Sequence, residues 1–376
     1  MKKILFVRKS NLQTGGVEMQ MIRAAVWLRD HRIASSVLAT DDLSGKLAAL
    51  FRDHGFEVIF CPLNGKGYAL RAVQILIKAV RTYGITHLQA HMFRESMVCR
   101  YVKLFQGGVV NVFRIETYID CSSISSLKKT LYHFLALITQ DLVDHYLPNG
   151  NLVRAELEHR SHVTSGNIKV IFNGVESFGE PDLEPISSDA SGFVDVVMVA
   201  NFIRGKGHEL LFDAIALLKS ESKHLRISLY GDDLEPAKPG VLRYGDELRT
   251  LTEKLNITDR VLFKGFTSDL RNELRRFSTL LLPSFSEGTP NTVLEAMSVR
   301  KLVIVSDAGE LPYMVEHMKS GLVHRKGDLR GLTDCLRQLF NPDQSLINEI
   351  RTCGYERWKS HFSLDHVMTE TASIYE

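Results

Sequence analysis

The chain of 376 residues lacks several patterns that identify common classes of enzyme. It has no Gly-x-Gly-x-x-Gly, which counts against a nicotinamide or flavin enzyme. It has no Asp-x-Asp and no group of Asp and His with the spacing of metal ligands, so we expect neither a metal site nor a cofactor. No stretch approaches the ~18 apolar residues that a transmembrane helix needs.

Cysteine is scarce, and its few positions are scattered. The chain has an odd number of cysteines and no Cys-x-x-Cys, which predicts reduced thiols in the cytoplasm and argues against a structural zinc. The five cysteines are Cys61, Cys99, Cys121, Cys335 and Cys353. The apolar run Ile4–Val7 is too short for the core of a signal peptide, so it predicts a buried first strand.

Charge is distributed unevenly along the chain, although the formal net charge is only +2. Residues 1–172 carry 22 Lys and Arg against 13 Asp and Glu, a net charge of +9, while the remainder carries 24 against 31, a net charge of −7. A basic half indicates an anionic partner, such as a membrane surface or a lipid phosphate. Attraction between a basic and an acidic domain explains the asymmetry equally well. The basic residues do not cluster with aromatic ones, so we expect no nucleic-acid partner.

Short β-branched runs alternate with amphipathic segments of helical length, which predicts parallel sheets covered by helices on both faces. The strands expected in the first half are Ile4–Val7, Ser35–Ala39, Glu57–Phe60, His87–Ala90, Val109–Ile115, His145–Leu147 and Ile168–Phe172. The strands expected in the second half are Val194–Val199, Arg226–Tyr230, Val261–Phe263, Leu280–Leu282 and Leu302–Val305. Between the halves, residues 173–192 have the composition of a linker. This order predicts an α/β fold with two Rossmann-like domains, and the cleft between them is the expected ligand site.

The most informative stretch is Ser286–Glu295, which contains two glutamates around a helix-start signal. Pro290 suits the first helical turn, and Thr289 before it is the expected N-cap. Glu287 then lies in the entering loop and Glu295 inside the helix, with both facing one crevice beside free backbone N–H groups. A polyhydroxyl ligand that carries phosphate suits such a site. A capped surface helix that happens to contain two glutamates is the simpler alternative.

Two loops with glycines precede other expected helices. Gly15 and Gly16 follow the first expected strand, where backbone N–H groups approach a phosphate or a sugar, although a tight turn explains them equally well. Arg204 and Lys206 lie in the loop 202–208, a pattern that suits a diphosphate clamp. A solvated basic loop is the alternative.

Three further positions follow expected strands. Gly231 lies in a turn at the end of one strand, and Phe266 ends another strand whose main chain is suited to contact a base. His91 follows a strand of the first domain and is the best placed of the 14 histidines for catalysis. A lone histidine at such a place is more often structural.

Together these residues resemble the family 4 glycosyltransferases of GT-B fold, over nearly the whole chain. The pair Glu287 and Glu295, in its Ser-Glu-Gly and Leu-Glu-Ala-Met context, is the most specific element. The turn at residues 15–18, the junction at 173–175 and the loop at 201–207 follow in the family's order. The resemblance implies a first domain over residues 1–175, a nucleotide-sugar-binding domain over 176–357, and a C-terminal helix over 358–376 that packs back on the first domain.

The resemblance also implies an activity. It implies a retaining, metal-independent hexosyltransferase that takes a sugar from a nucleotide-diphosphate sugar, in the first place a UDP-sugar. The acceptor would be a glycan or a lipid-linked molecule in the assembly of a cell-surface polysaccharide, lipopolysaccharide or glycolipid. A catalytically inactive GT-B protein that binds partners, and a sugar-nucleotide epimerase of the same fold, are the alternatives.

The resemblance assigns roles to individual residues. Lys206 and Arg204 would neutralise the leaving diphosphate, and Glu295 would hold the ribose hydroxyls. Glu287 would contact the donor sugar, and His91 would lie against that sugar near the reacting carbon. The catalytic residues implied are His91, Arg204, Lys206 and Glu287. The donor-binding residues implied are Gly15, Gly16, Asn201, Arg204, Lys206, Gly231, Phe266, Glu287, Gly288, Thr289, Pro290, Asn291, Thr292 and Glu295.

The chain departs from the family's pattern at several places. Asn201 stands where many members have an arginine, so the phosphate-binding arginine is expected at Arg204 instead. Glu310 introduces a carboxylate into a loop that normally contacts the diphosphate, and Arg300 is a further departure. Glu116 stands where many relatives have a histidine.

The helix expected over Leu127–Gln140 begins with two lysines, Lys128 and Lys129. Its apolar positions at helical spacing are Leu131, Phe134, Leu135 and Ile138. A helix of this kind is suited to an anionic leaflet, so we predict that the first domain docks on the inner face of the cell membrane to reach a lipid-linked acceptor. Packing of the same stripe in the core of the first domain is the alternative.

Overall fold

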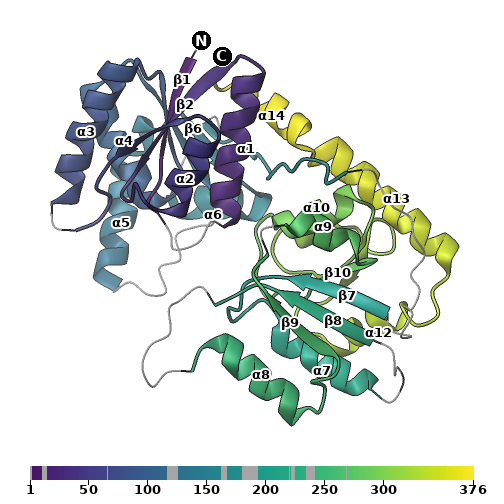
Figure 1. The fold of residues 1–376 in the computed structure, drawn as a ribbon. Helices are drawn as coiled ribbons and strands as arrows, with labels where there is room; N and C mark the ends of the chain where they lie inside the picture. The colour runs from purple at the N-terminus through teal and green to yellow at the C-terminus, as the bar shows by residue number, and fades with distance from the viewer. Residues whose placement is uncertain are drawn as a thin grey trace. The chain divides into compact units, whose positions relative to one another are not determined.

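The computed structural model describes residues 2–10, 15–65, 67–116, 126–161, 167–179, 194–219, 221, 225–233, 242–267 and 269–376. The chain forms two compact units (Figure 1). The first comprises Met1–Gly174 together with Leu364–Glu376, and the second comprises Val175–Ser363.

A six-stranded parallel sheet in the order β3-β2-β1-β4-β5-β6 forms the centre of the first unit. Its strands are β1 (Lys2–Val7), β2 (Ala34–Thr40), β3 (Glu57–Phe60), β4 (His87–Ala90), β5 (Val110–Ile115) and β6 (His145–Pro148). Each begins within two residues of the apolar run that predicts it. The agreement is close because a strand buried on both faces needs a continuous apolar run.

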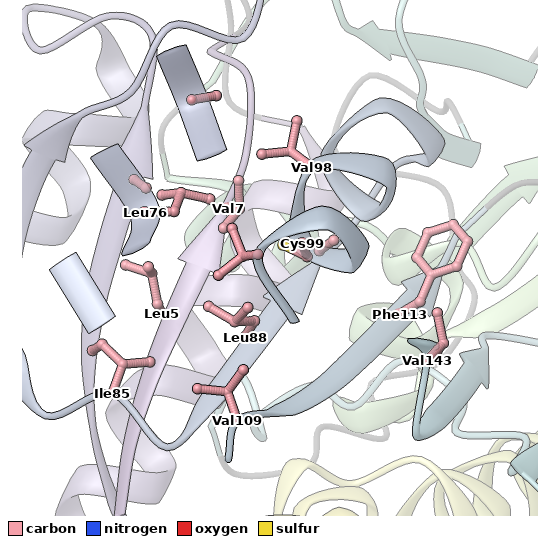
Figure 2. Close-up of a cluster of buried hydrophobic side chains, with 14 of the residues drawn as sticks. Leu5, Val7, Leu76, Ile85, Leu88, Val98, Cys99, Val109, Phe113 and Val143 are labelled. Carbon is pink, nitrogen blue, oxygen red and sulfur yellow. The ribbon is translucent and has the colours of Figure 1, made fainter. Parts of the chain in front are cut away.

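Helices cover both faces of this first sheet. They are α1 (Gly16–Asp30), α2 (Lys46–Asp53), α3 (Tyr68–Tyr83), α4 (Phe93–Phe105), α5 (Ser126–Ile138), the short 3-10 helix η1 (Gln140–Leu142), α6 (Asn151–Ser161) and α14 (Leu364–Ala372). Leu5 and Val7 of β1 pack into one core with residues of α3 and α4, as Figure 2 shows. The alternate residues Ile4 and Phe6 enter a second core with α1, α2 and α14.

The second unit repeats the same arrangement. Its parallel sheet has the order β12-β11-β10-β7-β8-β9. The strands are β7 (Val194–Val199), β8 (Leu225–Tyr230), β9 (Val261–Gly265), β10 (Thr279–Leu282), β11 (Leu302–Ser306) and β12 (Leu322–His324). The helices are α7 (His208–Leu218), α8 (Tyr244–Lys254), α9 (Leu270–Arg275), α10 (Asn291–Ser298), α11 (Leu311–Met314), α12 (Leu329–Arg337) and α13 (Gln344–His361). The prediction of an α/β fold with two Rossmann-like domains is confirmed.

Two expected elements differ from the structure. The strand expected over Ile168–Phe172 is wrong: that segment makes a single bridge, between Ile168 and Tyr146, and otherwise has no strand pairing. The C-terminal helix expected over residues 358–376 is interrupted, because α13 ends at His361 and α14 begins at Leu364. The later helix packs on α1, where Trp27 donates its indole N–H to Asp365 at 2.7 Å. Most of the expected linker, residues 180–192, lies outside the described residues.

The strand order of each sheet reverses at one point. In the first sheet β1 and β4 are neighbours, and in the second sheet β7 and β10 are neighbours. Ligands of open α/β sheets bind beyond the carboxyl ends of the strands at such a switch point. Gly15 follows β1 and His91 follows β4, while Lys206 follows β7 and Glu287 follows β10. The topology therefore brings the expected residues of each unit to its switch point.

Candidate functional site

Two loops of the second unit meet at Lys206 and Glu287. The Lys206 Nζ lies 2.7 Å from Oε1 of Glu287. The hydroxyl of Ser284 donates to the same carboxylate oxygen at 2.6 Å. The Lys206 side chain is 25% exposed and that of Glu287 is 6% exposed. The switch point of the second sheet thus presents a partly exposed ammonium group whose position is fixed by a more deeply buried carboxylate.

Glycines allow the backbone of these loops to come close together. Gly207 has a φ of +83°, and a Cβ at that position would lie 2.0 Å from the carbonyl oxygen of Pro283. Gly309, in the loop after β11, has a φ of +59°, and its Cβ would lie 1.8 Å from the carbonyl oxygen of Glu287. Only glycine fits these two positions without displacing its neighbour. The backbone around Glu287 is therefore held from two sides.

Arg204 and Lys206 share a loop but have different partners. The Arg204 side chain is 65% exposed, and its guanidinium contacts Glu209 Oε1 at 3.2 Å and also Glu247 Oε2. It lies 4.8 Å from the ring centroid of Tyr244. The two expected cations therefore have different partners in the structure. A diphosphate clamp made of both stays a prediction.

The helix after Glu287 begins one residue later than expected. The N-cap of α10 is Pro290, with a φ of −69° and an extended ψ of 118°, and its own side chain makes no capping hydrogen bond. The expected N-cap Thr289 is therefore wrong. Glu295 lies inside α10 and is buried. The other residues expected to bind the donor in this stretch are Gly288 in the loop, and Asn291 and Thr292 in the first turn of α10.

The carboxyl ends of β7, β8 and β9 lie next to one another. The N–H of Gly231 donates to the carbonyl of Gly265 at 3.0 Å, and a Cβ at Gly231 would lie 2.0 Å from the carbonyl oxygen of Ala200. Asn201 follows Ala200 and is half-buried. Phe266, directly after Gly265, is an exposed aromatic side chain. An exposed ring at the end of a strand offers a face on which a planar base can stack.

His208 begins α7 directly after the loop that carries Lys206. Its side chain is fully buried and lies edge-on to the rings of Phe202 and Tyr244, with centroid distances of 5.5 and 6.1 Å. Burial, together with the charge of Lys206, lowers the pKa of His208 to about 4. This imidazole is therefore neutral near pH 7, and it packs at the end of the loop without adding charge.

In the first unit, Gly15 caps α1 but does not offer its N–H to a ligand. That N–H donates to Oε2 of Glu18 at 2.9 Å. The other oxygen of Glu18 accepts from Arg8 Nη2 at 2.7 Å, and both side chains are buried. Gly16 is the first residue of α1. Residues 11–14, just before this turn, lie outside the described residues.

His91 is buried in a polar cluster at the end of β4. Its Nε2 lies 2.9 Å from Nε2 of Gln89, and its Nδ1 lies 3.6 Å from Oε1 of Glu116. Arg114 Nε donates to the same oxygen of Glu116 at 3.2 Å, and Asn149 Nδ2 donates to the other oxygen at 3.0 Å. Both ring nitrogens of His91 thus face protein groups. Direct contact of His91 with a donor sugar stays a prediction.

The charges in this cluster are fixed by their neighbours. Burial alone would raise the pKa of Glu116, but the Arg114 guanidinium and the neighbouring His91 outweigh it and hold the pKa at about 2. Burial lowers the pKa of His91, although Glu116 acts in the opposite direction. At neutral pH the cluster therefore contains an ionised Glu116 and a neutral His91.

Sequence reasoning missed several residues of both sites. Ser284 and Gly309 hold Glu287, while Gln89 and Asn149 complete the cluster around His91. The only signal for Ser284 is its position three residues before Glu287. The sequence contains no such signal for Gln89 or Asn149, because the residues that they contact lie in different strands and loops. Among the described residues, no group of three or more His, Cys, Asp or Glu is placed to hold a metal ion.

The second unit matches a known family. Residues 194–342 match the family model described as glycosyl transferases group 1. A putative colanic acid biosynthesis glycosyltransferase of Escherichia coli K12, WcaL, is 21% identical over 368 residues, which cover 93% of this chain and 84% of that protein. An N-acetylgalactosaminyltransferase of Campylobacter jejuni, which acts on a diphospho-undecaprenol-linked saccharide by its name, is 26% identical over 176 residues. Those residues cover 46% of this chain and 44% of that protein, so the match spans less than half of either.

Solved structures are similar over the whole chain. Anabaena HepE in complex with UDP and glucose has a TM-score of 0.81 at 18% identity, covering 99% of both chains. A glycosyltransferase from Rickettsia africae has a TM-score of 0.81 at 17% identity, covering 100% of this chain and 97% of the other. These solved structures confirm the GT-B type of fold. The match to the family model and the similarity to WcaL confirm the resemblance to glycosyltransferases. The assignment to family 4 in particular stays a prediction.

Proposed function

We propose that this chain, whose residues 194–342 match the family model of the group 1 glycosyl transferases, is a hexosyltransferase of polysaccharide or lipopolysaccharide assembly. It would move a sugar from a nucleotide-diphosphate sugar to a glycan or a lipid-linked acceptor. The observation that carries this proposal is the contact between Lys206 and Glu287 at the switch point of the second sheet. The names of WcaL and of the Campylobacter jejuni relative support the class of acceptor.

The residues of the second unit have a chemical role in this reaction. A departing nucleoside diphosphate gains negative charge in the transition state, and a preorganised cation stabilises that charge. Lys206 supplies the cation, Glu287 holds it in place until the donor binds, and Ser284 in turn holds Glu287. Glu287 then accepts hydrogen bonds from the donor sugar, and Glu295 accepts them from the ribose. We propose a UDP-sugar as donor, transfer without a metal ion, and retention at the anomeric carbon; the UDP in the HepE structure supports the first of these.

A thermal-shift screen against UDP-, GDP-, ADP- and dTDP-sugars tests the proposal. A ligand that binds the native state stabilises it by RT ln(1 + [L]/Kd), about 1.4 kcal/mol at ten times Kd. We expect at least one nucleotide sugar to raise the unfolding temperature of the wild type and of the control Glu253→Gln, whose side chain is exposed on α8. Glu295→Gln should lose most of that shift. No shift with any nucleotide sugar would contradict the proposal.

We further propose that α5 docks the first unit on an anionic membrane. Leu131, Phe134 and Ile138 are 51%, 56% and 59% exposed, so packing in the core of the first unit does not account for them. Lys128 and Lys129 lie in the first turn of the same helix. No helix in the described part of the chain is long and apolar enough to cross a membrane. An apolar stripe that follows two lysines suits a helix lying in the interface of an anionic leaflet, where each basic residue contributes ~1 kcal/mol.

The opposite side of α5 is fixed to the protein. Arg100 of α4 is buried, and its Nη1 donates to the carbonyl of Ala136 at 3.1 Å and to Oγ1 of Thr139 at 2.8 Å. These two acceptors lie at the carboxyl end of α5, where a cation is also favoured by the helix dipole. The exposed stripe is therefore presented by a helix with an anchored end.

Co-sedimentation with vesicles tests the docking proposal. We expect binding to anionic vesicles that weakens at high salt, and little binding to neutral vesicles. Phe134→Gln should reduce the binding, while Leu217→Gln, which changes a similarly exposed residue on α7, should not. Equal binding by both variants, or no binding in any condition, would contradict docking through α5.

A further inference from the structure

A chain of buried side chains links the C-terminal segment to His91. Tyr375 is 2% exposed, and its hydroxyl donates to Oε1 of Gln89. The amide nitrogen of Gln89 lies 2.9 Å from Nε2 of His91. On the other side of the ring, Nδ1 of His91 lies 3.6 Å from Oε1 of Glu116. The four side chains come from β4, from the residues just beyond β4 and β5, and from the segment that follows α14.

This arrangement selects one tautomer of His91. An amide nitrogen is only a donor, so Gln89 Nε2 donates and His91 Nε2 accepts. A neutral imidazole carries one proton, which therefore sits on Nδ1 and points towards the Glu116 carboxylate. If the Gln89 amide turned over, its oxygen would face the ring and draw the proton to Nε2. The lone pair of Nδ1 would then face an anionic carboxylate, which is repulsive.

The hydroxyl of Tyr375 disfavours the flipped orientation of the Gln89 amide. It donates to Oε1 of Gln89 on the side away from His91, where the flipped amide would place its N–H donors instead. The ring of Tyr375 is itself held edge-on against His87, with a centroid distance of 5.6 Å. The hydroxyl thus reaches Gln89 from a fixed position. Glu116, at the far end of the chain of contacts, is also fixed by Arg114 and Asn149.

We propose that Tyr375 and Gln89 are positioning residues for the transfer reaction, because they keep the proton of His91 on Nδ1 and so hold the His91–Glu116 pair in one orientation. The inference rests on the proposed function and on the role that the family resemblance implies for His91, which is to lie against the donor sugar. Tyr375 and Gln89 are themselves buried. They act through His91, and a site of this kind has to be held within ~0.5 Å of its working geometry.

Nitrogen NMR of the histidine rings, on the full chain labelled with 15N, tests the tautomer directly. We expect His91 of the wild type to carry its proton on Nδ1. Tyr375→Phe should give a mixture of tautomers, since it removes the hydroxyl and keeps the ring. Gln89→Glu should draw a proton onto Nε2, because it places an anionic acceptor beside that nitrogen. A proton on Nε2 in the wild type, or ring shifts of His91 that are unchanged in both variants, would overturn the proposal.

Steady-state kinetics tests whether the tautomer of His91 affects the transfer reaction. We expect Tyr375→Phe to lower kcat roughly tenfold or more while KM for the nucleotide sugar changes less than about twofold, because small displacements of a reacting constellation are costly. Tyr83→Phe is the matched control, since its hydroxyl bonds Glu57 at the surface of the same unit, and it should keep wild-type kcat. Equal kcat for both variants would overturn a positioning role. Absence of transfer by the wild type would overturn the proposed function instead, and the ring shifts would still decide whether the tautomer is fixed.

Discussion

At the scale of single residues, Lys206 supplies a positive charge and Glu287 fixes its position. The ammonium group is close enough to the surface to meet a ligand, while the carboxylate that holds it is nearly buried. Removal of the lysine would leave Glu287 with the hydroxyl of Ser284 as a partner and would remove the cation from the switch point. The pair therefore matters for the reaction more than for the fold.

Lys206→Ala should lower kcat/KM by an amount equivalent to about 2–4 kcal/mol, roughly 30- to 1,000-fold, because it removes charge stabilisation of the leaving diphosphate. Arg204→Ala should lower it by less, because the Arg204 guanidinium is already engaged by Glu209 and Glu247. The control is Lys219→Ala, which changes an exposed lysine at the end of α7. Steady-state kinetics with the true donor measures all three. Wild-type kcat/KM in Lys206→Ala would rule out its role.

The Glu116 carboxylate should make stability depend on pH at acid values. Its pKa is about 2 in the folded protein against an ordinary value of 4.5, so the folded state binds the proton less readily than the unfolded chain. The stability that Glu116 contributes is therefore complete above pH 4.5 and is lost as the pH falls towards 2. Urea unfolding between pH 3 and 7 should show a weaker acid loss in Glu116→Gln than in the wild type. An identical pH dependence would contradict the ionised cluster.

The sequence could identify residues at this scale but not their partners. The sequence predicts Glu287 and Lys206 in one site because both follow strands at the same sheet edge. It also predicts Arg204 in that site, yet the Arg204 guanidinium contacts Glu209 and Glu247. Gly205, with a φ of +94°, separates the two cations, and nothing in the residue order predicts that backbone conformation. Which side chains of neighbouring loops contact each other depends on local backbone dihedral angles of this kind.

At the scale of elements, the turn between β7 and α7 contains Gly205 and Gly207, and alanine should be more destabilising at Gly207 than at Gly205. Gly207 and Gly205 both have positive φ, so alanine at either incurs roughly 1–2 kcal/mol of backbone strain. A Cβ at Gly207 would also strike the Pro283 carbonyl, whereas a Cβ at Gly205 would meet nothing within 4 Å. Gly207→Ala should therefore lower the unfolding temperature much further than Gly205→Ala, and it should also weaken donor binding. Equal unfolding temperatures would contradict the account of this turn.

Most strands could be predicted because their runs are short, apolar and buried on both faces. The segment Ile168–Phe172 has the same composition but runs beside β6, where Lys169 and Ile171 donate to main-chain carbonyls without forming a ladder. The three-residue strand β12 is too short to be predicted from a pattern. The apolar stripe of α5 fitted a buried helix or a docking helix equally, and only the exposure of Leu131, Phe134 and Ile138 separates the two.

At the scale of the whole molecule, two units of the same topology carry opposite charge. The first holds a buried polar cluster at its switch point, and the second holds the loops expected to bind the donor. The proposed reaction draws its charge stabilisation from Lys206 and from the start of α10. Activity should therefore persist after exhaustive treatment with EDTA. Loss of activity in chelator, with recovery on adding manganese or magnesium, would contradict this mechanism.

The most direct test of the account is the transfer reaction itself. The full chain would be incubated with the nucleotide sugar that stabilises it and with a lipid-linked or glycan acceptor. Release of the nucleoside diphosphate and the anomeric configuration of the product would then be measured by NMR. The account predicts transfer with retained configuration, strongly reduced in Lys206→Ala and unchanged in Lys219→Ala. Inverted configuration, or equal transfer by the two variants, would contradict it.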